Sequence, residues 1–275
     1  NDDTNMKIQQ LIKENNEARP ERKGMFTTGI VSVLQGRHIA LFATGRQHAG
    51  ENLEDILKKR DQNLPPPIHM CDALACNIPK GLQTILANCL THGRRKFVDV
   101  LDNFPDECRH IIEQLALVYK NDDIAKKQGM SAQERLVFHQ QESESVMTEL
   151  SRWCAAQLKE HKVEPNSGLG KAITYMQNHW EPLTLFLREP GAPLDNNICE
   201  RALKKAIQHR KNSLFYKTLH GARIGDLFMS LIYTCQLNEA NPFDYLTQLQ
   251  KNLKDVLAAP HKWMPWNYRE NLPNE

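Results

Sequence analysis

The chain has 275 residues, 40% of them hydrophobic, and a formal net charge of +2. A chain of this length can bury a substantial core and can form one large domain or two smaller ones. No apolar run approaches the roughly 20 residues that span a bilayer, and the first residues lack the basic and apolar parts of a signal peptide. We therefore expect a globular protein of the cytoplasm with no membrane segment.

The seven cysteines are scattered and odd in number, without a C-x-x-C pair. This usage favours reduced thiols over a disulfide framework. Cys71, Cys76, Cys89 and His92 carry the side-chain types that bind zinc, but their spacing differs from the short paired gaps of structural zinc sites. Buried free cysteines are the preferred interpretation.

Strand signals come early in the chain. Residues 1–23 are polar and predict a loop or a short helix. Two runs rich in β-branched and aromatic residues, 25–33 and 37–44, flank the turn signal Gln35-Gly36 and predict a β-hairpin.

A second strand-bearing stretch follows a short helix expected at 52–60. Three consecutive prolines block helix formation and predict a short strand at 68–70, which ends beside Asp72. We next expect a helix over 75–87 that is interrupted near Pro79, then a strand at 88–91 and a helix opened by the cations after His92. Polar residues at strand ends are typical of functional sites in α/β folds.

Helical periodicity alone fills residues 105–187. We expect helices at 106–127, 131–159 and 169–187, the second of them opened by a capping box of Ser131 and Glu134. Later helices are expected at 221–237 and 242–253. Trp263 and Trp266 in the proline-broken tail are interpreted as packing anchors rather than as platforms for base stacking.

The helix expected from about Asn196 combines an apolar flank with a basic flank. From Arg201 to Arg223 there are seven Lys or Arg residues and no Asp or Glu. Glu200 lies on the seam between the two flanks, where its carboxylate can point into the fold beside cations. The plain alternative is a surface Glu200 paired with Lys204, and a basic flank that is simply solvated.

Three carboxylates therefore stand in comparable settings: Asp2 or Asp3, Asp72 and Glu200. Carboxylates that converge repel one another unless a cation such as Mg²⁺ neutralises them. Two such ions activate a water or a 3′-hydroxyl and stabilise the leaving oxygen of a phosphodiester. The basic stretch would supply the attraction to phosphates that DNA binding requires.

Three motifs resemble one known family. The stretch from Pro193 to Leu246, which opens P-L-D-N-N-I-C-E-R-A-L, resembles the C-terminal catalytic region of bacterial insertion sequence 66 transposases. C-L-T-H-G-R-R-K-F, starting at Cys89, resembles the family segment C-W-x-H-x-R-R-K-F. Met264-Pro265-Trp266-Asn267 resembles the family's L-P-W-N.

This resemblance implies an RNase H-like, mixed-sheet α/β core with a DDE triad, a large all-α insertion and a helical C-terminal region. The domains would be residues 1–104 for the first part of the core, 105–187 for the insertion, 188–240 for the second part with the catalytic helix, and 241–275 for the C-terminal helix and tail.

The resemblance also implies the functional residues. N-D-D-T matches a family A-D-E-T motif, so Asp2 is the first acid and Asp3 its acidic neighbour. Asp72 is the second acid, with Ala73 where the family has glycine, and Glu200 is the third. The three would hold Mg²⁺ or Mn²⁺. The residues expected to contact DNA are His92, Arg94, Arg95, Lys96, Arg201 and Arg210.

The expected activity is cleavage and joining of DNA phosphodiesters during transposition, without a covalent enzyme intermediate. Expected partners are transposon ends and target DNA, a second copy of the chain and an accessory protein encoded by the element, in the bacterial nucleoid. Two alternatives stay open. The chain is a truncated remnant that binds DNA without chemistry, since the strand that delivers Asp2 is expected just upstream of it, or it is a helical scaffold protein.

Overall fold

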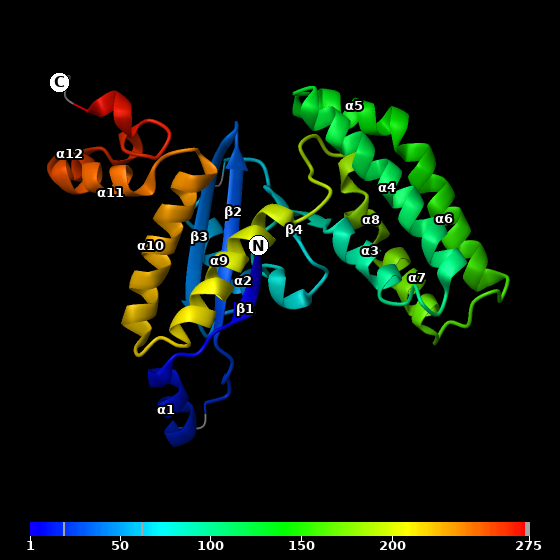
Figure 1. Ribbon diagram of the computed structural model, residues 1–275, viewed down its shortest axis with the longest axis horizontal. Helices are drawn as coiled ribbons and strands as arrows, with labels where there is room; N and C mark the ends of the chain where they lie inside the picture. The colour runs from blue at the N-terminus through cyan, green and yellow to red at the C-terminus, as the bar shows by residue number, and fades with distance from the viewer. Residues whose placement is uncertain (19, 62, 273–275) are drawn as a thin grey trace. The chain divides into compact units, whose positions relative to one another are not determined.

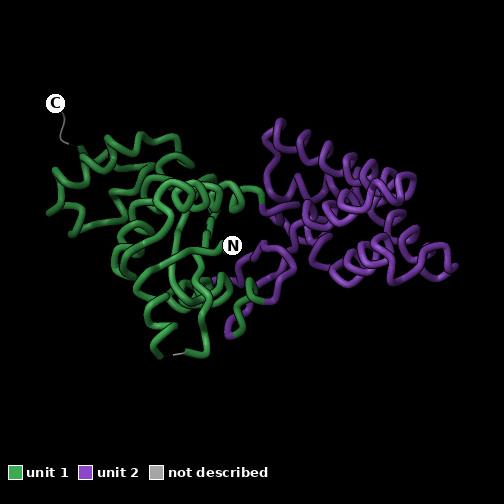
Figure 2. The backbone as a smooth tube through the Cα atoms, turned by 60° about the horizontal axis from the view of Figure 1, so that its bottom comes forward, with its two compact units in different colours: residues 1–59, 76–80, 197–275 green, residues 60–75, 81–196 purple. Residues whose placement is uncertain are grey.

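The computed structural model describes residues 1–18, 20–61 and 63–272 (Figure 1). The chain folds into two compact units (Figure 2). The first unit comprises Asn1–Lys59, Cys76–Lys80 and Asn197–Glu275, and the second comprises Arg60–Ala75 and Gly81–Asn196.

The first unit is built on an antiparallel sheet of three strands in the order β1-β2-β3. Strands β2 (Phe26–Leu34) and β3 (Arg37–Gly45) form the predicted hairpin, in which Leu34 pairs with Arg37. Gln35 and Gly36 both have positive φ angles, of 50° and 76°. Such a two-residue turn matches the right-handed twist of the flanking strands, and the predicted hairpin is confirmed.

Strand β1 (Asp2–Asn5) was not expected. The sequence predicted a loop or short helix over residues 1–23, but Asp2–Asn5 pairs antiparallel with β2, and only then does helix α1 (Gln9–Ala18) begin. The strand consists entirely of polar residues, so it carries no alternation of apolar side chains. Backbone pairing with β2, rather than apolar packing, makes it a strand.

Helices α9 (Asn197–Ser213) and α2 (Ala49–Leu57) contact the sheet through different strand residues. Successive side chains of a strand point to opposite faces, so each helix meets an alternate set. On the α9 face, Ala40 and Phe42 pack with Ala202 and Ala206 of α9. On the α2 face, the amide of Asn52 donates to the hydroxyl of Thr28 over 2.8 Å.

Helix α10 (Leu219–Leu237) lies along the outer edge of β3 (Figure 1). A ladder of polar side chains joins the helix to this edge. Four helical residues rise about 6 Å, close to the advance of two strand residues, so side chains four apart reach alternate backbone groups. The ladder satisfies an edge that would otherwise expose unpaired groups. Its members accept from the backbone N–H groups of β3 as follows: Asp226 from Thr44, Ser230 from Phe42, Thr234 from Ala40, and Asn238, the C-cap, from His38.

The C-terminal part of the first unit packs around the end of α10. Helices α11 (Pro242–Lys251) and α12 (Leu253–Ala258) are followed by the 3₁₀ turns η3 (Pro260–Lys262) and η4 (Tyr268–Asn271). Trp263 is buried among Cys235, Tyr245 and Tyr268, and Tyr245 donates to the carbonyl oxygen of Trp263 over 2.8 Å. Trp263 is therefore a packing anchor, as predicted.

The second unit contains a parallel pair of short strands, β4 (Ile68–Cys71) and β5 (Ile85–Asn88). The predicted strand at 68–70 is confirmed. The predicted helix at 75–87 is wrong: only the 3₁₀ turn η1 (Ala75–Asn77) forms before β5, because Pro79 interrupts the segment. The strand predicted at 88–91 lies earlier, and helix α3 (Leu90–Val98) begins within that range.

The rest of the second unit is helical. Its elements are α4 (Pro105–Lys127), α5 (Ala132–Glu142), α6 (Glu144–Lys159), α7 (Gly168–Asn178), α8 (Trp180–Leu183) and the 3₁₀ turn η2 (Leu185–Leu187). The capping box of Ser131 and Glu134 is present, with bonds of 2.8 and 3.3 Å. The single helix predicted at 131–159 is wrong, because the chain breaks at Ser143, which is fully buried. The range 169–187 likewise holds two short helices and a turn.

A buried charge cluster ties α4 to α5. Asp122 is 3% exposed and contacts Lys126 at 2.6 Å, Arg135 at 2.6 Å and His139 at 3.3 Å. Burial alone would raise the pKa of Asp122, but the hydrogen bonds from His139 and Lys126 and the charge of Arg135 hold it well below its ordinary value.

All seven cysteines are free, six of them buried and Cys76 half-buried, as expected.

Within residues 1–18, 20–61 and 63–272, no helix has the length and apolar content that crossing a bilayer demands. The protein is thus a helix-rich α/β protein with small sheets, and the α/β class and the helical block predicted from the sequence are confirmed.

Candidate active site

The first predicted acid, Asp2, lies in strand β1 directly opposite Gly29 of β2. The carbonyl oxygen of Gly29 accepts a hydrogen bond from the thiol of Cys199, in the first turn of α9, over 3.2 Å. Residues directly opposite each other in an antiparallel pair project from the same face. Asp2 therefore projects from the face of the sheet that α9 covers.

The third predicted acid, Glu200, follows Cys199 in the first turn of α9 and is half-buried. Burial is the main cause that raises the pKa of the Cys199 thiol. This thiol bonds to Gly29, the strand partner of Asp2, and Glu200 is the next residue of the chain, so both carboxylates lie near it. The structure brings the first and third predicted acids into the same region of the first unit.

Asn77 contacts the first acid and was not singled out from the sequence. Its side chain is 1% exposed, and its amide Nδ2 lies 3.4 Å from Oδ1 of Asp2. The same oxygen accepts from the backbone N–H of Asp3 over 2.8 Å. Asp2 is thus oriented by neighbours from two segments of the chain.

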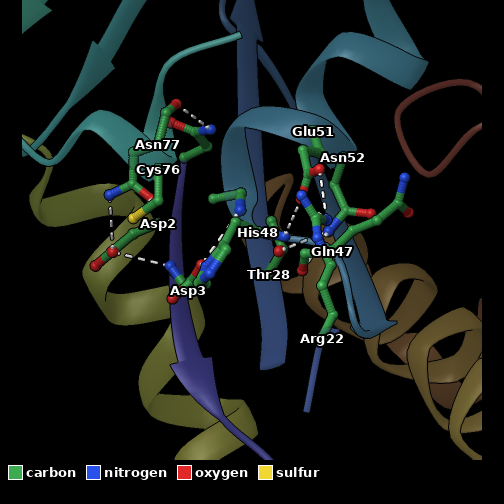
Figure 3. A network of polar contacts seen from close by, with 12 residues as sticks. Asp2, Asp3, Arg22, Thr28, Gln47, His48, Glu51, Asn52, Cys76 and Asn77 are labelled. Carbon is green, nitrogen blue, oxygen red and sulfur yellow. Dashed lines mark hydrogen bonds and ion pairs between the residues drawn. The ribbon is translucent and has the colours of Figure 1, made fainter. Parts of the chain in front are cut away.

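Asp3 points the other way (Figure 3). Its Oδ2 lies 2.9 Å from Nδ1 of His48 and 3.2 Å from the backbone N of Ala49, at the start of α2. The sequence left open which of Asp2 and Asp3 is the first acid. The α9 face carries Asp2, while Asp3 belongs to the α2 face.

The second predicted acid, Asp72, follows β4 in the second unit. Its Oδ1 accepts from the backbone N–H of Leu74 over 3.3 Å, and its charge adds to the burial that raises the pKa of Tyr175 to about 12. Its position at a strand end is as predicted. Its convergence with Asp2 and Glu200 stays a prediction, because it belongs to the other unit.

The basic residues predicted to contact DNA are divided between the units. Arg201 is exposed on α9, as are Lys204 and Lys205 beside it. Arg210 donates to the hydroxyl of Thr4 over 3.2 Å and to the carbonyl oxygen of Asn5, so it ties α9 to β1.

The remaining predicted DNA contacts, His92, Arg94, Arg95 and Lys96, lie on α3 of the second unit. Arg95 and Lys96 are exposed, and Nζ of Lys96 lies 5.4 Å from the ring centre of Tyr175. The surface position suits a phosphate contact, and their role in DNA binding stays a prediction.

These features define an α/β protein with two acidic residues gathered at one face of a small sheet and exposed cations on the adjoining helix. Residues 1–224 match the IS66 family of transposases, and the chain belongs to that family. The resemblance stated from the motifs is thereby confirmed.

Two relatives from Sinorhizobium fredii, both uncharacterized, illustrate the relationship. The protein y4jD is 34% identical over 191 residues, which is 67% of this chain, and y4hP is 28% identical over 210 residues, which is 72% of it. The chain covers 36% and 38% of the lengths of these relatives. No solved structure matches the chain.

Proposed function

We propose that this chain is the catalytic region of a DDE-type transposase that cleaves and joins DNA phosphodiesters with two divalent metal ions. Asp2, Asp72 and Glu200 are the proposed metal ligands. The observation that carries the proposal is that Asp2 projects from the sheet face on which α9 packs, while Glu200 follows Cys199, whose thiol donates to Gly29 opposite Asp2. Membership of the IS66 transposase family supports the same activity.

The donor atoms suit the proposed metal. Mg²⁺ and Mn²⁺ prefer oxygen ligands, and both acids of the first unit offer carboxylate oxygens. Asp2 is held by Asn77 and by strand pairing, while Glu200 is fixed in a helical turn. Carboxylates oriented in this way bind a hard cation without first being ordered. When bound, the ions would activate the attacking oxygen and stabilise the leaving one.

Chain connectivity supports the inclusion of Asp72. Asn77, whose side chain contacts Asp2, lies five positions after Asp72 in the chain. Five residues of fully extended chain span at most about 18 Å, so the second acid is tethered to the neighbourhood of the first.

We further propose that the core is RNase H-like. The first acid lies on a strand beside an antiparallel hairpin, the second follows another strand, and the third opens a helix after a helical block. This is the order that the family resemblance implied. The cations of α9 and α3 would bind the phosphates of transposon ends and target DNA through charge rather than base sequence. A second copy and an accessory protein are proposed as partners, and the cytoplasm and nucleoid as the location.

The test measures metal binding and DNA cleavage by the whole chain. Mn²⁺ binding is followed by electron paramagnetic resonance, and cleavage on an end-labelled DNA duplex with and without Mg²⁺. Asp2→Asn, Asp72→Asn and Glu200→Gln each remove one carboxylate at nearly constant size. Asp123→Asn is the matched control, because Asp123 is an exposed acid on α4 paired with Lys127.

We expect metal-dependent cleavage that each of the three substitutions reduces by at least about a hundredfold, as loss of a preorganised catalytic group does. The control should leave it unchanged. DNA binding without cleavage would favour the inactive remnant. Failure to bind both DNA and Mn²⁺ would favour the scaffold.

A further inference from the structure

Strand β1 needs a lateral support beyond its pairing with β2. It has four residues and pairs on one side with β2 within the described sheet. Short edge strands of polar residues gain little from packing and fray readily. Any movement of such a strand also moves the carboxylates that it carries, so their position depends on the contacts that hold the strand.

Asp3 supplies a cap to helix α2. The N-cap of α2 is His48, which forms a capping box with Glu51 although histidine is not among the residue types that usually cap helices. In addition, Oδ2 of Asp3 accepts from the first backbone N–H of the helix, that of Ala49, over 3.2 Å. A carboxylate at a helix N-terminus is favoured by the helix dipole, so this contact binds β1 to α2.

The imidazole of His48 completes the contact and is itself fixed. Its Nδ1 lies 2.9 Å from Oδ2 of Asp3. Its backbone N–H donates to Oε2 of Glu51 over 3.0 Å, and its ring packs on that of Phe26, with the centroids 4.1 Å apart. Arg22 in turn holds Glu51 at 2.6 Å (Figure 3). These contacts restrict the position of the His48 ring, the partner of Asp3.

We propose that Asp3 and His48 form a positioning pair that fixes β1 against α2 and thereby aims Asp2 from the opposite face of the strand. The inference rests on the proposed function, in which Asp2 binds metal. It assigns different tasks to two adjacent acids. Asp2 is a metal ligand, and Asp3 acts through the strand without contacting the reacting atoms.

The different roles of the two neighbouring acids follow from the alternation of side chains along the strand. Asp3 pairs with Thr28, whose hydroxyl accepts from Asn52 of α2, and Asp2 pairs with Gly29, which contacts α9. Rotation or slippage of β1 by one residue would exchange these faces. The contact with His48 holds the side chain of Asp3, and not that of Asp2, on the α2 face. It therefore opposes a shift of β1 by one residue.

The test uses paired substitutions in the whole chain. His48→Leu and Asp3→Ala remove the contact. His48→Asn keeps an N–H donor near the position of Nδ1, and Asp3→Asn keeps an acceptor on the strand. Gln47→Ala is the control, because Gln47 adjoins His48 but bonds to Asp55 through an exposed contact. Circular dichroism verifies that each variant is folded.

Two readouts are taken: Mn²⁺ affinity by electron paramagnetic resonance, and hydrogen exchange of the β1 amides by mass spectrometry. His48→Leu and Asp3→Ala should weaken Mn²⁺ binding by about tenfold or more, as loss of an outer-shell partner does. Both should also speed exchange in β1 by about tenfold. His48→Asn, Asp3→Asn and the control should stay close to the parent chain in both readouts.

Unchanged Mn²⁺ affinity and β1 exchange in His48→Leu and Asp3→Ala would overturn the positioning role. So would loss of Mn²⁺ binding in Asp3→Asn with slow β1 exchange retained, since Asp3 would then be a ligand. Failure of the proposed function has a different signature: the parent chain would bind no Mn²⁺, and Asp2→Asn would change nothing. The exchange experiment would still decide whether Asp3 and His48 hold the strand.

Discussion

The thiol of Cys199 donates to the carbonyl oxygen of Gly29 over 3.2 Å, and this contact seats the start of α9 on the centre of the three-stranded sheet. Glycine at this position permits the close approach of α9. A Cβ atom on Gly29 would lie 3.2 Å from Leu203 and 3.7 Å from the sulfur of Cys199. A larger side chain would therefore crowd the contact between the helix that carries Glu200 and the strand paired with Asp2.

Replacement of Gly29 by valine should lift α9 away from the sheet. Overpacking of a close contact costs about 1–3 kcal/mol, and we expect a loss of this size in the free energy of unfolding of the first unit. Mn²⁺ affinity should fall with it, because Glu200 moves relative to Asp2. Urea denaturation followed by tryptophan fluorescence, together with metal titration, measures both effects.

Gly45→Val is the matched control for this change. Gly45 ends strand β3, and a Cβ atom there would meet nothing within 4 Å. We expect a change within about 0.5 kcal/mol. Equal losses for the two variants would show that the contact between Gly29 and α9 is not what positions the helix.

The buried carboxylate of Asp122 should dominate the stability of the helical block. Asp122→Ala removes the partner of Arg135 and His139 at a site that is 3% exposed. Loss of one member of a buried charged cluster costs about 3–5 kcal/mol, because the remaining charges stay desolvated. Asp123→Ala, an exposed neighbour paired only with Lys127 among the described ion pairs, should cost less than about 1 kcal/mol. Thermal unfolding of both variants measures the difference.

The same carboxylate gives the second unit a defined pH dependence. The folded-state pKa of Asp122 is held below its ordinary value, so the folded form binds fewer protons than the unfolded one. Its contribution is complete above about pH 5 and is lost as the pH falls through the folded-state pKa. Asp122→Asn should flatten the decline between about pH 5 and pH 2. An unchanged pH profile would exclude Asp122 as the group responsible.

Short sequence patterns correctly predicted the elements that are stabilised by contacts between residues close together in the chain. The hairpin followed from the turn at Gln35 and Gly36, and the capping box of Ser131 and Glu134 marked a true helix start. The break at Ser143 was missed, because no glycine or proline signals it. The chain turns there around a buried hydroxyl that contacts His139 at 3.0 Å and Asn121 at 3.1 Å, a tertiary arrangement without a local sequence signature.

In the candidate site, too, the sequence predicted some residues, while those that depend on tertiary contacts were missed. Asp2, Asp72 and Glu200 were predicted through family motifs, and spacing alone would not have selected them among 33 acidic residues. His48, Asn77 and Gly29 were missed, because their importance comes from the pairing register of β1 with β2. Strand β1 is entirely polar, so its sequence has no alternation of apolar residues from which the strand or its register could be predicted.

The polar ladder of α10 should be required for the edge of β3. The hydroxyl of Thr234 accepts from the backbone N–H of Ala40 over 3.1 Å and lies 3.2 Å from its carbonyl oxygen. Thr234→Val keeps the shape and leaves these groups unsatisfied, which costs about 1–3 kcal/mol. Thr247→Val on α11 removes an exposed hydroxyl that bonds its own helix, and should cost less than about 0.5 kcal/mol. Similar costs in urea denaturation would argue against the ladder.

The exposed cations of α9 should determine how DNA binding depends on salt. Arg201, Lys204 and Lys205 are exposed on the helix that carries Glu200. Each phosphate contact that is lost reduces the slope of log affinity against log salt by about 0.9, so a triple change to glutamine should lower it by up to about 2.7. The matched control has the same change in net charge and replaces exposed lysines of the same unit outside α9: Lys13, Lys59 and Lys251. Fluorescence anisotropy with a labelled duplex at several salt concentrations measures both slopes. Equal slopes in the two triple variants would mean that DNA responds to the net charge of the protein and not to this face of α9.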